Sequence, residues 1–516
     1  MAGALFSCLP GAGGFGERIQ IPAIKGDQVS KQSIHEAVII GAGLGGLAAA
    51  VNLQNEGVED YLILEKSDGV GGTWRSNSYP GCGCDTQMIA YQYSFAIRGD
   101  WDRLYPPAKD ILSYCERVAD DFGLRPHLHT GVEVTGLEWS DSDNVWSISS
   151  RYGEVYQARS VVMALGQFSK VSIPSFPGID TFRGATMHTG AWDHSVDFEG
   201  KRVAVVGSAA SAVQVIPQLA KIASHLDVYQ RTPNWVIGRG DREISELEKK
   251  LLAENPNMVN ADRDHQLAWQ DILLWRVFEM NETAQEYYQG VAKAHLETQV
   301  KDPAFREKLT PDYPLGCKRI LISDDFYPTL QEDHVDLITD PISSLDATGI
   351  TTAAGNHREY DIIVWATGFD EIGWHQWIPV KGVSGQTLSE AWSPVPTAYL
   401  GINVPNFPNL FVMYGPNTNL GHGPITFMLE RQAEYIARAI AYLQKTQVSA
   451  LDVREEALRE YQEELTGRLA SSAWASPLCS SYYKSADGTV TKNWMGSMDE
   501  YEKRTGSFDE KAYVLT

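Results

Sequence analysis

Two stretches of the chain share one hydrophobic pattern: a short apolar run, a tight turn of small residues and the start of a helix. The first reads Val-Ile-Ile-Gly41-Ala-Gly43-Leu-Gly-Gly46, and the second reads Val-Ala-Val-Val-Gly207-Ser208-Ala209-Ala-Ser211-Ala212. Such turns are typical of βαβ units that bind dinucleotides, because small residues let the backbone approach a pyrophosphate. The second motif has alanine at two positions where glycine is usual, so a plain strand–turn–helix stays an alternative there.

The two units end in opposite charges. Glu65 stands 24 residues after Gly41, and Arg231 stands 24 residues after Gly207. A carboxylate accepts hydrogen bonds from ribose hydroxyls and repels a 2′-phosphate, whereas a guanidinium attracts one. The pattern therefore predicts FAD in the first unit and NADPH in the second, which together indicate a flavin enzyme fed by NADPH.

The remaining pattern predicts an α/β fold with two dinucleotide-binding, Rossmann-like domains. Residues 130–165 alternate apolar and polar positions, as antiparallel strands do, and residues 240–310 have helical spacing, which predicts a helical insertion. A strand at 360–368 is expected to return the chain to the first domain, and a long amphipathic helix is expected at 427–446. The expected parts are an N-terminal extension (1–35), an FAD-binding domain (36–168 and 355–516) and an NADPH-binding domain that includes the insertion (169–354).

Composition narrows the class of protein. The chain has 516 residues and a net charge of −23, which argues against binding to nucleic acid or to anionic membranes. No apolar run reaches the roughly 18 residues of a membrane span, and the N-terminus lacks the basic residues of a secretory signal. Six cysteines are no disulfide framework in a chain of this length, and Cys82 and Cys84 are interpreted as packing residues rather than metal ligands. These features indicate a cytoplasmic protein.

A longer motif lies in the segment 182–193, which is expected to be a linker between the two domains, just before the second glycine turn. Phe182-Arg-Gly184-Ala-Thr-Met-His188-Thr189-Gly-Ala-Trp192-Asp193 resembles, at every fixed position, the fingerprint of the type I Baeyer–Villiger monooxygenases of the flavin-containing monooxygenase superfamily. Three other segments are similar to family segments: Gly-Gly72-Thr73-Trp74, Ala-Thr367-Gly368-Phe-Asp370 and Tyr-Pro-Gly-Cys-Gly83-Cys-Asp85. Relatives usually carry arginine at the position of Gly83. The resemblance covers roughly residues 36–500.

The resemblance implies an activity. NADPH would reduce FAD, dioxygen would add to form a C4a-peroxyflavin, and this would attack a ketone to give an ester or lactone. Arg319 would be the catalytic cation beside the peroxide, with Asp85 as the partner that holds it. Arg231, Thr232 and Lys318 would bind the 2′-phosphate, and Tyr482 would lie in a loop that closes over the nicotinamide. His188 is interpreted as a pivot that bonds backbone rather than as an acid or base.

The full set of residues expected to bind cofactor follows from both arguments, and no metal site is expected. It comprises Gly41, Gly43, Gly46, Glu65, Gly72, Thr73, Trp74, Asp85, Gly207, Ser208, Ala209, Ser211, Arg231, Thr232, Lys318, Thr367, Gly368 and Tyr482. Two other functions stay open: a flavin monooxygenase that oxygenates nitrogen or sulfur nucleophiles, and a redox sensor or scaffold that keeps flavin without turnover. Arg319 and the Trp192-Asp193 ending favour the ketone reaction.

Overall fold

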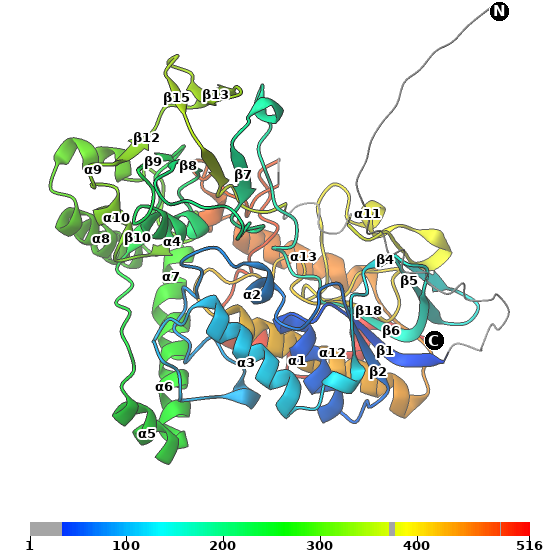
Figure 1. Ribbon diagram of the computed structural model, residues 1–516. Coiled ribbons are helices and arrows are strands. Elements are labelled where there is room, and N and C mark those ends of the chain that lie inside the picture. Colours follow the sequence, from blue (N-terminus) through cyan, green and yellow to red (C-terminus); the bar gives the residue numbers. More distant parts are fainter. Residues whose placement is uncertain (1–32, 371–376, 486) are drawn as a thin grey trace, which may run out of the picture. The chain divides into compact units, whose positions relative to one another are not determined.

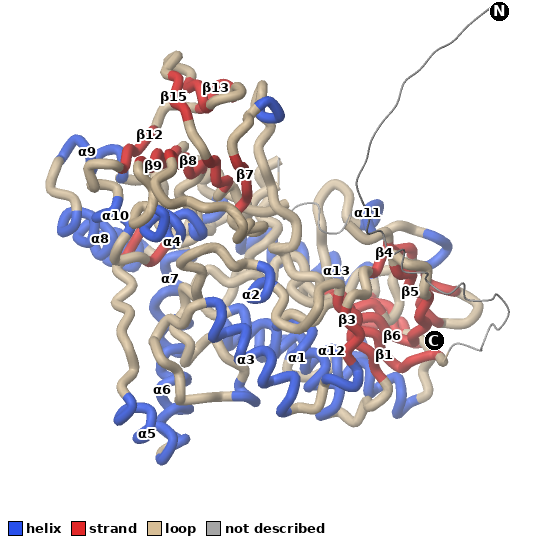
Figure 2. The backbone as a smooth tube through the Cα atoms, viewed as in Figure 1, coloured by secondary structure: helices blue, strands red, loops and turns tan. Residues whose placement is uncertain are grey.

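The computed structural model describes residues 33–370, 377–485 and 487–516. The extension expected at 1–35 therefore lies almost entirely outside the described residues. Most of the described chain forms two sheets with their covering helices (Figures 1 and 2). None of the helices in these residues is long and apolar enough to cross a membrane.

The first sheet has the strand order β17-β4-β5-β6-β1-β2-β3, and β18 pairs with β6. β1, β2, β3, β6 and β18 pair in parallel, whereas β4, β5 and β6 form the antiparallel meander expected from the alternating pattern. β4 alternates buried and more exposed positions because it has one covered face. The strands are β1 (Ile34–Ile40), β2 (Tyr61–Glu65), β3 (Leu128–Thr130), β4 (Val134–Ser140), β5 (Val145–Ser150), β6 (Val155–Met163), β17 (Val380–Lys381) and β18 (Leu410–Val412).

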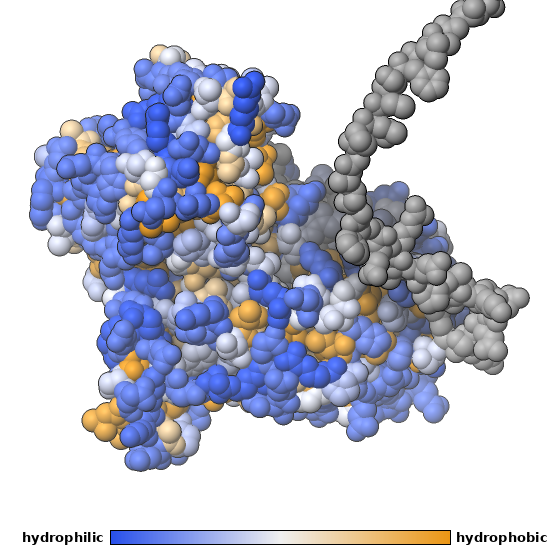
Figure 3. All heavy atoms as spheres, in the orientation of Figure 1, coloured by the Kyte–Doolittle hydropathy of each residue, from blue (hydrophilic) through white to orange (hydrophobic). Residues whose placement is uncertain are grey.

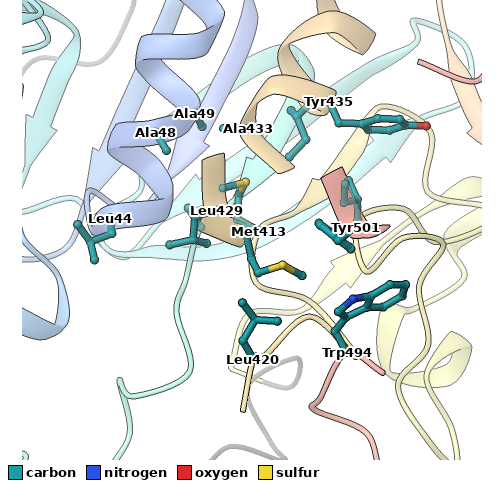
Figure 4. Close-up of a cluster of buried hydrophobic side chains, with 14 of the residues drawn as sticks. Leu44, Ala48, Ala49, Met413, Leu420, Leu429, Ala433, Tyr435, Trp494 and Tyr501 are labelled. Atoms are coloured by element: carbon teal, nitrogen blue, oxygen red, sulfur yellow. The ribbon is translucent and has the colours of Figure 1, made fainter. Parts of the chain in front are cut away.

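Helices α1 and α12 pack against each other beside this sheet. Figure 4 shows the small side chains Ala48 and Ala49 of α1 close to Leu429 and Ala433 of α12, so the two helices can approach closely. The expected amphipathic helix at 427–446 is confirmed as α12. The helices of this part are α1 (Leu44–Asn55), α2 (Thr73–Ser76), α3 (Ala108–Asp121), α11 (Leu388–Ala391), α12 (Ile425–Thr446), α13 (Glu455–Leu469) and α14 (Met498–Thr505), and β19 (Leu451–Val453) pairs with β20 (Tyr513–Leu515).

The second sheet is fully parallel, in the order β12-β9-β8-β16-β7. Two expectations need correction here. β16, expected to return the chain to the first domain, pairs with β8 and β7 in the second sheet. The segment read as a linker at 182–193 contains β7, an edge strand of that sheet. The elements are β7 (Ala185–His188), β8 (Arg202–Val206), β9 (His225–Tyr229), β12 (Val335–Ile338), β16 (Ile362–Trp365), α4 (Ala210–Leu219) and α10 (Phe326–Thr329).

The expected helical insertion is confirmed as a run of helices after the short strand β10 (Val236–Ile237), which pairs with β11 (Leu321–Ile322). Side chains of Ser245, Asn281 and Asp302 cap three of these helices. Hydrophobic residues lie on the surface at α5 (Figure 3), where Leu247 is 78% exposed. The helices are α5 (Glu246–Glu254), α6 (Pro256–Trp269), a π-helical turn (Gln270–Leu274), α7 (Trp275–Phe278), α8 (Glu282–Gln299) and α9 (Pro303–Leu309), and three small strands complete this half: β13 (Ile342–Leu345), β14 (Gly349–Thr352) and β15 (His357–Glu359).

Candidate active site

The two glycine turns repeat each other in three dimensions. Gly41 and Gly207 both have positive φ, 104° and 121°. A Cβ on Gly41 would lie 2.5 Å from the carbonyl oxygen of Ala164, and one on Gly207 would lie 2.3 Å from that of Ala366. Each turn is therefore pressed against the end of a neighbouring parallel strand, where only glycine fits. The backbone of both turns is left open to a ligand, as dinucleotide binding requires.

The first turn is completed by an acid. Glu65 ends β2, and its side chain is buried. One carboxylate oxygen accepts a hydrogen bond of 2.7 Å from the backbone N–H of Ala42, and the other accepts one of 2.7 Å from the N–H of Ser67. Gly72 packs on the same turn, since a Cβ there would lie 2.8 Å from Cα of Gly43. A carboxylate fixed in this way keeps acceptor capacity for a ribose hydroxyl.

The second turn is completed by cations. Arg231 follows β9 and is exposed, and Lys318 lies near enough that their charges repel. Burial, together with the Arg231 charge, holds the pKa of the Lys318 ammonium below its usual value. The Lys318 Nζ stands 4.8 Å from the ring centre of Tyr313. No carboxylate lies within ion-pairing distance of Arg231 or Lys318 in the described part of the chain, so the two charges are available to an anion.

Asp85 and Arg319 meet although 234 residues separate them in the chain. Arg319 donates from Nε and from Nη2 to the two carboxylate oxygens of Asp85, each at 2.6 Å. Burial acts to raise the pKa of the Asp85 carboxyl, but the Arg319 charge and its hydrogen bonds outweigh it, so the pKa lies below its usual value. The Asp85 charge raises the pKa of Arg319 well above its usual value. Asp85 thus fixes the Arg319 guanidinium in place and keeps it permanently charged.

One cavity of about 1210 Å³ joins both turns and this pair. Nearly all the residues expected at the cofactors line it: Gly41, Gly43, Glu65, Gly72, Thr73, Trp74, Asp85, Gly207, Ser208, Ala209, Ser211, Arg231, Thr232, Lys318, Arg319, Thr367, Gly368 and Tyr482. Gly46 does not line it. A Cβ on Gly46 would lie 1.9 Å from the carbonyl oxygen of Gly41, so this glycine serves the packing of α1 on its turn.

The fingerprint segment reaches the cavity at one residue. Thr189 lines it, and its hydroxyl lies 3.0 Å from that of Ser211 in the second glycine turn. His188 is buried, its Nδ1 accepts a hydrogen bond from the backbone N–H of Gly190, and burial lowers its pKa to about 4. Phe182, Gly184, Trp192 and Asp193 are not among the lining residues. The segment thus packs beside the second nucleotide unit and contacts its turn through Thr189.

Sequence reasoning missed the lining residues Gln167 and Tyr414, which come from distant loops. Gln167 is buried and donates to the carbonyl of Tyr414 at 3.1 Å, and the Tyr414 hydroxyl donates to Asn419 at 2.6 Å. These residues follow β6 and β18, and carboxyl ends of parallel strands are where ligands of open α/β sheets lie. That rule is the signal that could have found them.

The cysteines also differ from expectation, because one disulfide links Cys317 to Cys479. Cys317 lies directly before Lys318 and Arg319, and Cys479 directly before the cavity-lining residues Ser480, Ser481 and Tyr482. Cys82, Cys84 and Cys115 are free thiols. A pairing across 162 residues leaves no local signal in the sequence.

One cavity is shared by two dinucleotide units. The first unit ends in a carboxylate and the second in cations, and an arginine–aspartate pair lies beside them. This arrangement defines the class of flavoprotein monooxygenases that use two nucleotides. A family model described as pyridine nucleotide-disulphide oxidoreductase matches residues 38–259. A Baeyer–Villiger monooxygenase of Streptomyces coelicolor is 38% identical over 94% of both chains, and one of Pseudomonas aeruginosa is 37% identical over 93% of this chain and 91% of the relative.

Solved structures of monooxygenases are also similar to this chain. A steroid monooxygenase bound to NADP and a cyclohexanone monooxygenase from Rhodococcus sp. Phi1 bound to NADP⁺ each match with a TM-score of 0.83 and 29% identity, over 94% of this chain and 99% of theirs. The chain belongs to the Baeyer–Villiger monooxygenase family. It is an FAD-dependent enzyme that uses NADPH.

Proposed function

We propose that this protein uses NADPH and dioxygen to insert one oxygen atom beside the carbonyl of a ketone, giving an ester or a lactone. The observation that carries the proposal is the Arg319–Asp85 pair, which stands on the cavity shared by both nucleotide units. A cyclohexanone monooxygenase that is 28% identical to this chain has been solved with ε-caprolactone bound, and a lactone belongs to the product class proposed here.

The bound FAD, reduced by NADPH, supplies the activated oxygen, and the residues of the chain supply position and charge. Arg319 stabilises negative charge that develops on the ketone oxygen during attack. Its raised pKa keeps it cationic, so it cannot donate a proton that would end the reaction early. Asp85 orients the guanidinium by the two-point contact and leaves its outer edge for the substrate.

The other proposed roles concern cofactor binding and water. Glu65 binds ribose of FAD, while Arg231, Thr232 and Lys318 bind the 2′-phosphate of NADPH. The backbones of the two glycine turns hold the pyrophosphates. Tyr482 and the loop 480–484 cover the nicotinamide side of the cavity and exclude water, since Ser480, Ser481 and Tyr482 line it.

The test follows NADPH consumption with a panel of linear, cyclic and bulky ketones, with product analysis and peroxide measurement. Wild type should form esters or lactones. Arg319→Ala should retain FAD and be reduced by NADPH, but lose ester formation by a factor of about 100–1000 and release hydrogen peroxide. Near-normal ester formation by Arg319→Ala would remove the role assigned to it. Oxygenation of sulfides or amines with no ketone turned over would favour the alternative function.

The compartment is a further part of this proposal. The low cysteine content supports a cytoplasmic location, where thiols are kept reduced. The Cys317–Cys479 disulfide then has to form against that reducing pool, so its formation needs an oxidant. Fractionation of the native host, with activity in the cytoplasmic fraction, tests the location.

A further inference from the structure

Arg239 reaches from the second half of the molecule to the loop that carries Asp85. It follows β10, and its backbone N–H donates to the carboxylate of Asp324 at 2.9 Å. Its Nη2 donates to the carbonyl oxygens of Cys84 at 3.1 Å and Tyr105 at 3.2 Å. Its guanidinium also lies 5.1 Å from the centre of the Tyr105 ring. One cation therefore ties three segments together at the residue next to Asp85.

Gly83, the residue before Cys84, lies beside this contact. A Cβ on Gly83 would lie 3.6 Å from Nη2 of Arg239, which is an ordinary van der Waals distance. The other hydrogen bonds to the backbone of Gly83 and Cys84 are neutral: the N–H of Cys84 donates to the carbonyl of Pro106 at 3.2 Å, and Gln214 donates to the carbonyl of Gly83 at 2.9 Å. A hydrogen bond from a charged donor is about twice as strong as a neutral one, so Arg239 is the main restraint on the carbonyl beside Asp85.

We propose that Arg239 is a positioning residue for oxygen insertion: it holds the backbone of Cys84 and Asp85 so that Asp85 keeps its two-point contact with Arg319. This inference rests on the proposed function. The competing explanation is that Arg239 only joins two halves of the molecule. Arg103 provides a matched control, because it also joins the two halves, pairing with Asp241 at 2.9 Å, and forms no hydrogen bond with Cys84.

The experiment compares Arg239→Met, Arg239→Lys and Arg103→Met as FAD-loaded enzymes. In Arg239→Met, amide hydrogen exchange in residues 82–88 should rise at least tenfold, and the share of NADPH that ends as hydrogen peroxide should rise about fivefold. FAD content and the rate of flavin reduction should stay within twofold of wild type. Arg239→Lys should restore part of the coupling, and Arg103→Met should resemble wild type.

Equal effects of Arg239→Met and Arg103→Met would overturn the positioning role, as would unchanged exchange and coupling in Arg239→Met. If wild type forms no ester, the proposed function fails, yet the exchange measurement still decides whether Arg239 restrains the loop. The two failures are therefore distinguishable.

A second inference rests on the disulfide. Cys317 and Cys479 are both buried, and their bond joins the segment of Lys318 and Arg319 to the first residue of the loop that carries Tyr482. Lys484, at the other end of this loop, donates to the carbonyls of Ser476 and Cys479 at 2.8 and 3.2 Å. The loop is thus anchored covalently at its start and by hydrogen bonds at its end.

We infer that the disulfide is a redox-controlled tether of the loop over the nucleotide. Hydrogen peroxide, which uncoupled NADPH oxidation releases, is the oxidant. The Cys479 thiolate attacks one peroxide oxygen, the O–O bond breaks, and the leaving hydroxide takes up the proton that the Cys479 thiol released, so that one water and a sulfenic acid form. The Cys317 thiolate then attacks the sulfenic sulfur, the S–S bond forms, and the leaving hydroxide takes up the proton that the Cys317 thiol released to give a second water. The two sulfurs lose the two electrons that the peroxide gains. Oxidation of the two cysteines to the disulfide would slow the dissociation of NADP⁺.

The test measures free thiols by alkylation and mass, and NADP⁺ dissociation by stopped flow, with and without a phosphine reductant. Oxidised wild type should release NADP⁺ at least fivefold more slowly than reduced wild type. Cys479→Ser should release it at the reduced rate under both conditions, whereas Cys115→Ser should behave as wild type. Absence of the Cys317–Cys479 bond after peroxide treatment, or equal release rates in both states, would overturn the tether.

Discussion

Arg231 and Lys318 place two like charges at the second nucleotide unit, and burial with the Arg231 charge lowers the pKa of Lys318. Like charges close together are costly unless an anion joins them. At the scale of single residues, preference for NADPH over NADH should therefore depend on these side chains.

Arg231→Ala should raise the KM for NADPH at least tenfold and leave the KM for NADH little changed, because a charge contact to the 2′-phosphate is worth about 1.5–3 kcal/mol. Steady-state kinetics with both nucleotides give the measurement. Arg202→Ala, an exposed arginine of the same sheet, is the control. An equal loss with both nucleotides would mean that Arg231 is structural.

His188 offers a prediction for pH. Burial lowers its pKa to about 4, below the unfolded value of about 6.5. The unfolded chain therefore binds the proton first, and stability is full above about pH 6.5 and falls as the pH drops toward 4. The loss should reach about 3 kcal/mol. His188→Asn cannot titrate and can still accept from Gly190. In urea unfolding between pH 7 and pH 4, the variant should lose less stability than wild type, and parallel curves would contradict the buried neutral imidazole.

At the scale of elements, the first strand–turn–helix unit contains glycines with two different roles, one in packing and one in ligand binding. A Cβ on Gly46 would strike the carbonyl oxygen of Gly41 at 1.9 Å, whereas one on Gly43 would meet the protein only at 3.5 Å, an ordinary contact with Gly72. Gly46 serves the fold of the unit, and Gly43 leaves space for the ligand.

Gly43→Ala should leave the melting temperature of the apoprotein unchanged and weaken FAD retention, because the added methyl group points into the pyrophosphate site. Gly46→Ala should lower the melting temperature and FAD content together. FAD per chain and thermal unfolding of apoprotein provide the measurements. A drop in apoprotein stability for Gly43→Ala would show that the turn itself, rather than the ligand, needs this glycine.

At the scale of the whole molecule, a buried ion pair joins the helical insertion to the first half. Arg263 of α6 lies 3.5 Å from Glu430 of α12, with side-chain exposures of 8% and 2%. Glu430 also accepts hydrogen bonds from the N–H and hydroxyl of Ser94. Burial raises the pKa of the Glu430 carboxyl, against the lowering effects of Ser94 and Arg263.

Arg263→Met should destabilise the protein by about 3–5 kcal/mol, because it leaves a buried carboxylate without its cation. The double variant Arg263→Met/Glu430→Gln should lose less than Arg263→Met alone, since no charge remains buried. Urea unfolding measures both. Lys503→Met, which breaks the exposed pair with Asp499, should leave stability close to that of wild type, because solvent screens such a pair. Additive losses in the double variant would mean that the pair is not coupled.

The sequence alone was sufficient to predict the two nucleotide units, with the acidic residue that ends the first and the basic residue that ends the second. The reason is that turn, spacing and charge are local properties of short segments. It also placed the meander at β4–β6, α12 and the helical insertion, where hydrophobic periodicity is strong. The positions of Arg319 and Asp85 were predicted from resemblance to a family, and their two-point contact appeared only in the structure.

Tertiary structure decided everything that depends on which distant segments meet. β16 is an apolar run that could complete either sheet, and only its pairing with β8 and β7 assigned it to the second. The Asp85–Arg319 contact, the Cys317–Cys479 bond and the place of Arg239 beside Cys84 each join residues more than 150 positions apart. Local pattern carries no information on such pairs, because the packing of the whole chain sets which of them come within bonding distance.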